Sequence, residues 1–319
     1  MKTYVLKRIG LIFVTAIVII FLVFVFIKLL PTYDAKVIGL DPEIAELIRQ
    51  REGYGKPIVE QFYIWVSNIF RYGNFGRSLT RNRDVFAIMG DRIPVSMRLN
   101  IIPYLIGIPI GIGLGIWAAL KKNKITDHVI STGVIFFISV PSFVVATMLQ
   151  YYVVYEWQLI DTPFVLATVD FKADFWRGIT SYIMPVTVMV IGNVAGLTRV
   201  TRAELTEVLT SEFMLLCRTK GLTKGQATVR HALRNAMVPI APSLIGGFIY
   251  IMSGSLIIEQ IFRVPGIGGV YLEAFNNQDY PLILGYLVFY TILSLFATLI
   301  VDLSYGFIDP RIRMGAGKK

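Results

Sequence analysis

Long apolar runs alternate with shorter polar segments along the chain, and their lengths predict its elements. A helix needs about 20 apolar residues to cross a hydrocarbon core about 30 Å thick. Six runs reach this length: residues 9–30, 99–120, 129–155, 179–198, 237–258 and 282–303. The pattern therefore predicts an all-α integral membrane protein with six transmembrane helices.

The first run follows Lys2, Lys7 and Arg8, so its flanking charge is that of a secretory signal peptide. The apolar stretch is too long for the core of such a peptide, and no small-residue cleavage site follows Leu30. We therefore predict a retained first span.

Basic residues are divided unequally between the segments that connect the spans. With the N-terminus inside, the inner segments 1–8, 121–128, 199–237 and 307–319 together carry 17 Lys and Arg residues. The short outer loops, 156–178 and 259–281, together carry 3. Because cytoplasmic loops are enriched in Lys and Arg, both termini are predicted to be cytoplasmic. The outer loop 31–98 carries ten, but loops longer than about 60 residues are translocated largely regardless of charge.

The long outer loop is predicted to contain two helices. A polar helix opens at Asp41 and ends near Glu52, before two glycines. A second, amphipathic helix starts at Pro57, with an apolar face of Ile58, Phe62, Trp65, Val66, Ile69 and Phe70. We expect this face to pack on the outer membrane surface or on the helix bundle, and an inert extracytoplasmic cap is the alternative.

The chain thus divides into three parts. Residues 1–30 hold the N-terminus and first transmembrane helix, and residues 31–98 form an extracytoplasmic loop. Residues 99–319 form a five-helix core that includes the cytoplasmic loop 199–237.

Composition agrees with a membrane protein. Hydrophobic residues make up 55% of the 319 and charged residues only 16%, against about 25% in soluble domains. The net charge of +10 could indicate nucleic acid as a partner, but the basic residues lie at the ends of apolar spans, which indicates membrane orientation instead. Cys217 is the only cysteine, so no intrachain disulfide is possible.

The middles of the predicted spans carry no Asp, Glu, Lys, Arg or His. Lys28, Glu259 and Asp302 lie at span ends, where they can reach the interface. This absence argues against ion coupling or a proton relay. Small polar residues do enter the spans and form a candidate path for a polar solute: Ser139, Ser142, Asn193, Ser253 and Ser255.

Packing of helices through small residues is the alternative role for this polar set. Gly107, Gly111 and Gly115 recur at four-residue spacing, so we expect them to seat a neighbouring helix.

Catalytic motifs are also missing from the sequence. It contains neither a phosphate-binding G-x-x-x-x-G-K-[ST] loop nor an H-E-x-x-H metal helix. The two histidines, His128 and His231, lie in different cytoplasmic loops without a ligand cluster. The sequence therefore predicts no catalytic and no metal site, and His231 is interpreted as a surface or packing residue.

The polar segment from Arg199 to Asn235 separates the fourth and fifth spans. Up to Lys220 its apolar residues recur every three or four positions, which predicts one helix. Gly221 then allows a sharp bend. Thr223 and Gln226 have the spacing of a capping box and start a short second helix. Pro239 and Pro242 are predicted to mark the turn into the fifth span.

This short basic helix suits insertion into a groove on a soluble partner. An amphipathic segment lying on anionic lipid fits the residues equally well.

Sequence motifs extend across nearly the whole chain in the order of a known family. They are NFGRSL at 74–79, DRIPVSMRLN at 91–100, ISVPSFVVATML at 138–149, CRTKGLTKGQATVRHALRNAMVPIAP at 217–242, FRVPGIGGVYLEAFNNQDYPLILG at 262–285 and DPRIR at 309–313. The chain resembles ABC-transporter permease subunits of the oligopeptide, dipeptide and nickel importer family, and is most similar to the B-type oligopeptide permeases. One departure concerns a Glu-Ala-Ala triplet of the general family, which is replaced here by Leu215, Leu216 and Cys217.

The resemblance implies a type I ABC importer fold in a bacterial cytoplasmic membrane. This chain would form half of the translocation channel with a homologous second permease, surrounded by membrane lipid. Two cytoplasmic ATPases would bind ATP and Mg²⁺, whereas this chain would bind no cofactor, and an extracytoplasmic peptide-binding protein would deliver the substrate. The residues implied to couple the ATPases are Arg218, Lys220, Gly221, Leu222, Thr223, Gly225, Gln226, Val229, Arg230, His231 and Arg234.

The function inferred from sequence is that of an oligopeptide importer permease, and three alternatives differ from it. A dipeptide or nickel-chelate permease is a near relative. A self-sufficient channel or secondary carrier would need a gate or an ion site within one chain. A membrane enzyme ranks last because no nucleophile–base or metal pattern has usable spacing.

Overall fold

The computed structural model describes residues 2–30, 42–43, 46–47, 55–73, 75–161, 163–165 and 174–308. Within these ranges the regular structure is helical, apart from an isolated β-bridge between Arg77 and Asp84. The α-helices are α1 (Lys2–Leu29), α3 (Ile58–Tyr72), α4 (Val85–Leu120), α5 (Ile125–Ser139), α6 (Ser142–Gln150), α8 (Phe175–Leu209), α9 (Glu212–Thr219), α10 (Lys224–Ala227), α11 (Leu233–Tyr250), α12 (Leu256–Ile261), α13 (Ile267–Asn276) and α14 (Tyr280–Ile308). Two π-helical segments, η2 (Tyr151–Glu156) and η3 (Thr228–Ala232), and one 3₁₀ segment, η4 (Ile251–Ser253), complete them.

Five of the predicted spans are single helical stretches long and apolar enough to cross a membrane. The third predicted span instead consists of α5 followed by α6 and η2, bent by 91°. The bend lies at Val140, which has an extended backbone with ψ of 123°. Pro141 follows it, and a proline disfavours helical geometry in the residue before it. The prediction of six crossings therefore holds when this bent pair counts as one span.

The fifth span contains both prolines that the sequence analysis placed at a turn. Pro239 and Pro242 instead lie inside α11, so that prediction is wrong. Membrane helices tolerate proline because local π and 3₁₀ adjustments pair the freed backbone groups again, and the π-helical η3 directly precedes α11. The actual break follows η4 at Gly254, where φ is +76°.

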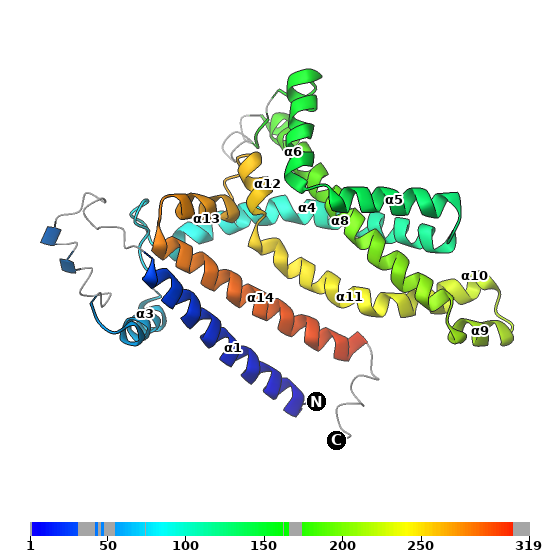
Figure 1. Cartoon of the computed structure of the whole chain (residues 1–319), viewed down its shortest axis with the longest axis horizontal. Helices are drawn as coiled ribbons and strands as arrows, with labels where there is room; N and C mark the ends of the chain where they lie inside the picture. Colours follow the sequence, from blue (N-terminus) through cyan, green and yellow to red (C-terminus); the bar gives the residue numbers. More distant parts are fainter. Residues whose placement is uncertain are drawn as a thin grey trace.

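The start of α1 and the end of α14 lie side by side, with α9 and α10 also at the same end of the molecule, away from α3 and α13 (Figure 1). Arg8 of α1 forms an ion pair with Asp302 of α14. The chain thus places on one side the segments in which basic residues concentrate, as the charge count predicted.

Helices α4 and α8 make the most extensive helix pair in the described chain. The three glycines at four-residue spacing lie on α4 in this interface: Gly107, Gly111 and Gly115. A methyl group added at Gly115 would stand 2.5 Å from Cβ of Thr201, and one at Gly111 would stand 2.9 Å from Cβ of Leu197. The Thr198 hydroxyl donates to the Gly111 carbonyl at 3.2 Å. The prediction that these glycines seat a neighbouring helix is confirmed.

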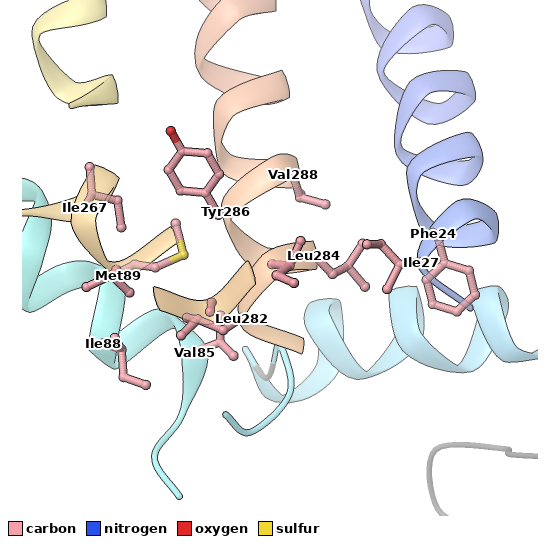
Figure 2. Close-up of a cluster of buried hydrophobic side chains, with 13 residues drawn as sticks. Phe24, Ile27, Val85, Ile88, Met89, Ile267, Leu282, Leu284, Tyr286 and Val288 are labelled. Carbon is pink, nitrogen blue, oxygen red and sulfur yellow. The ribbon is translucent and has the colours of Figure 1, made fainter. Parts of the chain in front are cut away.

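A buried apolar cluster closes the end of the molecule opposite the termini. Figure 2 shows side chains from α1, α4, α13 and α14 meeting there, including Phe24, Met89, Ile267 and Leu284. Because four elements share this cluster, it fixes α13 against α4 and α14.

The amphipathic helix predicted after Pro57 is α3, and it packs on α1 beside this cluster. The Phe62 ring stands 5.1 Å from Phe21 and 5.4 Å from Phe24, measured between centroids. Ile58, Phe62 and Trp65 of the predicted apolar face therefore pack on the helix bundle, whereas Phe70 is 85% exposed. Most of the polar helix predicted over 41–52 lies outside the described residues.

Candidate functional site

The cytoplasmic segment between the fourth and fifth spans folds into the end of α8, then α9, then α10. The single helix predicted up to Lys220 is interrupted at Thr210 and Ser211. The Ser211 hydroxyl donates to the Val208 carbonyl at 2.6 Å, and that of Thr210 donates to Thr206 at 3.0 Å. Hydroxyls that bond to the preceding turn compete with the helical ladder, which accounts for the interruption.

Gly221 makes the predicted bend after α9. Its φ of +85° is a left-handed value that L side chains rarely adopt. Its N–H donates to the Arg218 carbonyl at 3.0 Å, and the next N–H, of Leu222, donates to Cys217 at 3.3 Å. The bend therefore satisfies carbonyls at the end of α9 and turns the chain directly into α10.

The capping box predicted at the start of the short helix is present. The Thr223 hydroxyl accepts the N–H of Gln226 at 3.3 Å, and the Gln226 side-chain oxygen accepts the N–H of Thr223 at 3.1 Å. Helix α10 then continues through η3 into α11 with no non-helical residue between Lys224 and Tyr250. The exposed loop helix and most of the fifth span are therefore one continuous rod.

One face of this loop is buried against the ends of α4 and α8. Its cluster consists of Ala119, Leu205, Met214, Cys217, Ala227, Ala232 and Ala236. His231 is half-buried with its ring 6.0 Å from that of Phe213, which fits the packing interpretation.

The remaining residues that are predicted to couple the ATPases face outward. Leu222 is half-buried. The other residues of this set are exposed: Arg218, Lys220, Gly221, Thr223, Gly225, Gln226, Val229, Arg230 and Arg234. Sequence reasoning gave no weight to Leu215 and Leu216, yet both are exposed apolar side chains on α9. Their only sequence signal was the departure from the family triplet. Together these residues form an exposed surface of mixed apolar and basic character.

An ion pair that sequence reasoning missed ties this loop to the start of the third span. Arg202 of α8 contacts both carboxylate oxygens of Asp127 of α5, at 2.5 and 2.8 Å. The Asp127 side chain is 1% exposed and also accepts the N–H of Asn123 and the hydroxyl of Ser131. The partners are 75 residues apart in sequence, so spacing could not have revealed the pair.

We predict that Arg202→Gln lowers the free energy of unfolding by about 2 kcal/mol, because it leaves the buried Asp127 carboxylate without its cation. Thermal unfolding of the purified chain in detergent would measure this loss. Arg199→Gln, which removes an exposed charge one turn earlier on α8, serves as the control and should leave stability unchanged. The double change Asp127→Asn with Arg202→Gln should cost less than the sum of the two single changes. Additive costs would contradict a direct pairing.

The five candidate path residues occupy three separate places. Ser139 and Ser142 flank the bend of the third span and are exposed. Asn193 lies on α8 with its Cβ against Gly107. The other two, Ser253 and Ser255, are half-buried on either side of the Gly254 break. Four of the five thus lie at helix breaks, where backbone N–H and C=O groups are outside the regular hydrogen-bond pattern of the helix.

Glu259 does not reach the interface, so that expectation is wrong. Its carboxylate is fully buried and accepts the Ser96 hydroxyl at 2.6 Å, together with three backbone N–H groups, of Ser255, Gly268 and Gly269. Gly268 and Gly269 lie in the first turn of α13, whose N–H groups are thus within reach of this carboxylate. Glu259 therefore joins α4, α12 and α13 at one point.

No group of three or more His, Cys, Asp or Glu side chains within the described ranges is arranged to hold a metal ion. The membrane-length helices and the exposed helical loop on one side define a polytopic α-helical membrane protein. The chain belongs to the family described as binding-protein-dependent transport system inner membrane component, which it matches over residues 111–314. The corresponding N-terminal family matches residues 1–100. Members of this family are transporter permeases, and the chain is a multi-pass protein of the bacterial cytoplasmic membrane.

Curated relatives are similar over almost the entire chain. The dipeptide transport system permease protein DppB of Lactococcus lactis is 32% identical over 98% of this chain and all of the relative. The probable peptide ABC transporter permease protein y4tP of Sinorhizobium fredii is 31% identical over 98% of this chain and all of its own length. The glutathione transport system permease protein GsiC of Escherichia coli is 30% identical over 98% of this chain and 99% of its own length.

Proposed function

We propose that this chain is one half of the translocation channel of an ATP-driven importer of short peptides. Relatives named for dipeptide, glutathione and peptide transport, similar over nearly the full length, support the substrate class. The observation that carries the mechanism is the continuous helix from exposed α10 to the end of α11.

The channel would be completed by a homologous second permease. Two cytoplasmic ATPases would hold ATP and Mg²⁺ and bind the exposed surface around α10, with Arg230 and Arg234 among the contacts. An extracytoplasmic binding protein would present the peptide to the opposite end. ATPase closure would then push on α10 and move α11 with it, because no non-helical residue separates them.

A reconstitution experiment tests this proposal. We expect proteoliposomes that contain this chain, a second permease, two ATPases and a peptide-binding protein from the same cell to accumulate a radiolabelled tripeptide only when ATP is supplied. Omission of the ATPases should abolish accumulation. Peptide flux through the purified chain alone would instead identify a self-sufficient channel or carrier and would refute the proposal.

A further inference from the structure

A cavity of about 510 Å³ opens between α4, α12 and α13, at the end of the molecule away from α9 and α10. Its volume lies within the range of about 300–1,000 Å³ that is typical of small-molecule sites. Three arginines line it from different segments: Arg81 before α4, Arg92 on α4 and Arg263 after α12. Two glutamates, Glu259 and Glu273, together with Gln260 and two asparagines on and after α13, complete its polar wall.

The two carboxylates of the cavity are already engaged. Glu273 forms an ion pair with Arg81. The two carboxylate oxygens of Glu259 accept four hydrogen bonds, from the Ser96 hydroxyl and from three backbone N–H groups. A carboxylate offers about four lone-pair positions, so Glu259 has no capacity left for the arginines. Within the described chain, Arg92 and Arg263 therefore have no carboxylate partner.

These two guanidinium groups are nevertheless held in place. Arg92 is half-buried and donates one N–H to the Pro265 carbonyl at 3.2 Å, which leaves its other donors for a ligand. The guanidinium carbon of Arg263 stands 4.0 Å from the centroid of the Phe164 ring, a contact that orients the planar fork. Ordered side chains lose less entropy when a ligand binds.

The net charge of the residues that line the cavity indicates which class of ligand it would bind. With three arginines and two glutamates the lining has a formal charge of +1, which matches a singly charged carboxylate. Guanidinium groups bind carboxylates through paired, charge-assisted hydrogen bonds. The asparagine amides Asn276 and Asn277 add donors and acceptors that suit peptide groups.

We propose that this cavity is an extracytoplasmic subsite for the free C-terminal carboxylate of a peptide, with Arg92 and Arg263 as its donors. The inference rests on the proposed function for the substrate class. It adds a site for one end of the substrate, outside the membrane-spanning path.

The test compares trialanine with trialanine amide, which differ only in the terminal carboxylate. Binding to the purified full-length chain in lipid nanodiscs is measured by isothermal titration calorimetry. The wild type should bind the acid roughly tenfold more tightly than the amide, and Arg92→Gln with Arg263→Gln should abolish the difference. Arg263→Lys keeps the positive charge but lacks the paired N–H donors of a guanidinium group, so it should retain part of the preference for the acid over the amide.

Arg83→Gln is the matched control. Arg83 lies near Arg81 in sequence, pairs with Asp91 at 3.0 Å and does not line the cavity, so this variant should keep the full preference. Unchanged thermal unfolding of each variant separates a lost subsite from a lost fold. The proposal is overturned when the wild type binds neither form or both equally, or when the double variant keeps the preference.

ATP-driven uptake by the complete transporter separates this inference from the proposed function. Absence of peptide uptake by the wild-type complex counts against the proposed function. Wild-type uptake that is the same for acid and amide, and unaffected in the double variant, counts against the subsite alone.

Discussion

Gly221→Pro should reduce ATP-driven peptide uptake about 100-fold while the chain still inserts into the membrane. Proline fixes φ near −65°, whereas Gly221 has a φ of +85° and donates its N–H to Arg218. An incompatible proline costs about 3 kcal/mol in a helix interior, and we expect a cost of about the same size at this bend; about 1.4 kcal/mol corresponds to tenfold in an equilibrium. The native bend would then be a minor population, and α10 would no longer meet its partner in the required orientation.

Uptake by proteoliposomes and co-purification of the ATPases measure this effect. Gly221→Asn is the matched variant, because asparagine tolerates left-handed backbone angles, and it should retain most of the uptake. Gly133→Ala, on α5 with open space around it, should behave as the wild type. Wild-type uptake by Gly221→Pro would refute a role for this bend in coupling.

Gly115→Leu should prevent α4 and α8 from packing and should cost more than about 3 kcal/mol of stability. Its Cβ alone would stand 2.5 Å from Cβ of Thr201 and 2.9 Å from the carbonyl oxygen of Thr198. The carbonyl belongs to the helix backbone, so the clash can be relieved only by separating the two helices. Because this pair is the most extensive in the described chain, we expect aggregated or degraded protein.

Size-exclusion chromatography in detergent and thermal unfolding would measure the loss. Gly113→Leu is the control on the same helix, since nothing lies within 4 Å of a Cβ at that position. It should yield monodisperse protein of near wild-type stability. Equal behaviour of the two variants would contradict close helix contact at Gly115.

The spans, the orientation and the turn chemistry of the loop could be predicted because they depend on local signals. Apolar length marks the membrane helices. The spacing of Thr223 and Gln226 indicates the N-terminal cap of α10. The four-residue repeat that includes Gly111 indicates a surface where another helix packs closely. Each of these patterns lies within a few turns of one helix.

Contacts between distant segments could not be predicted in this way. Asp127 and Arg202 meet only because α5 returns along α8, and Glu259 finds Ser96 of α4 across 163 residues. The 91° bend at Val140 and the continuity of α11 through Pro239 show the same limit. In both places a proline is present, and only the surrounding packing decides whether the helix bends.

The unbroken helix from Lys224 to Tyr250 also fixes the direction in which its exposed side chains point relative to the Gly254 break. Its three segments comprise 4, 5 and 18 residues, so the rod is about 40 Å long. One residue added or removed between Arg230 and Tyr250 would turn Arg230 about 100° relative to the Gly254 break. The proposed mechanism therefore depends on the number of residues between the exposed arginines and this break, independently of their identity. The interruption at Thr210 and Ser211 lies outside the rod and carries no such constraint on length.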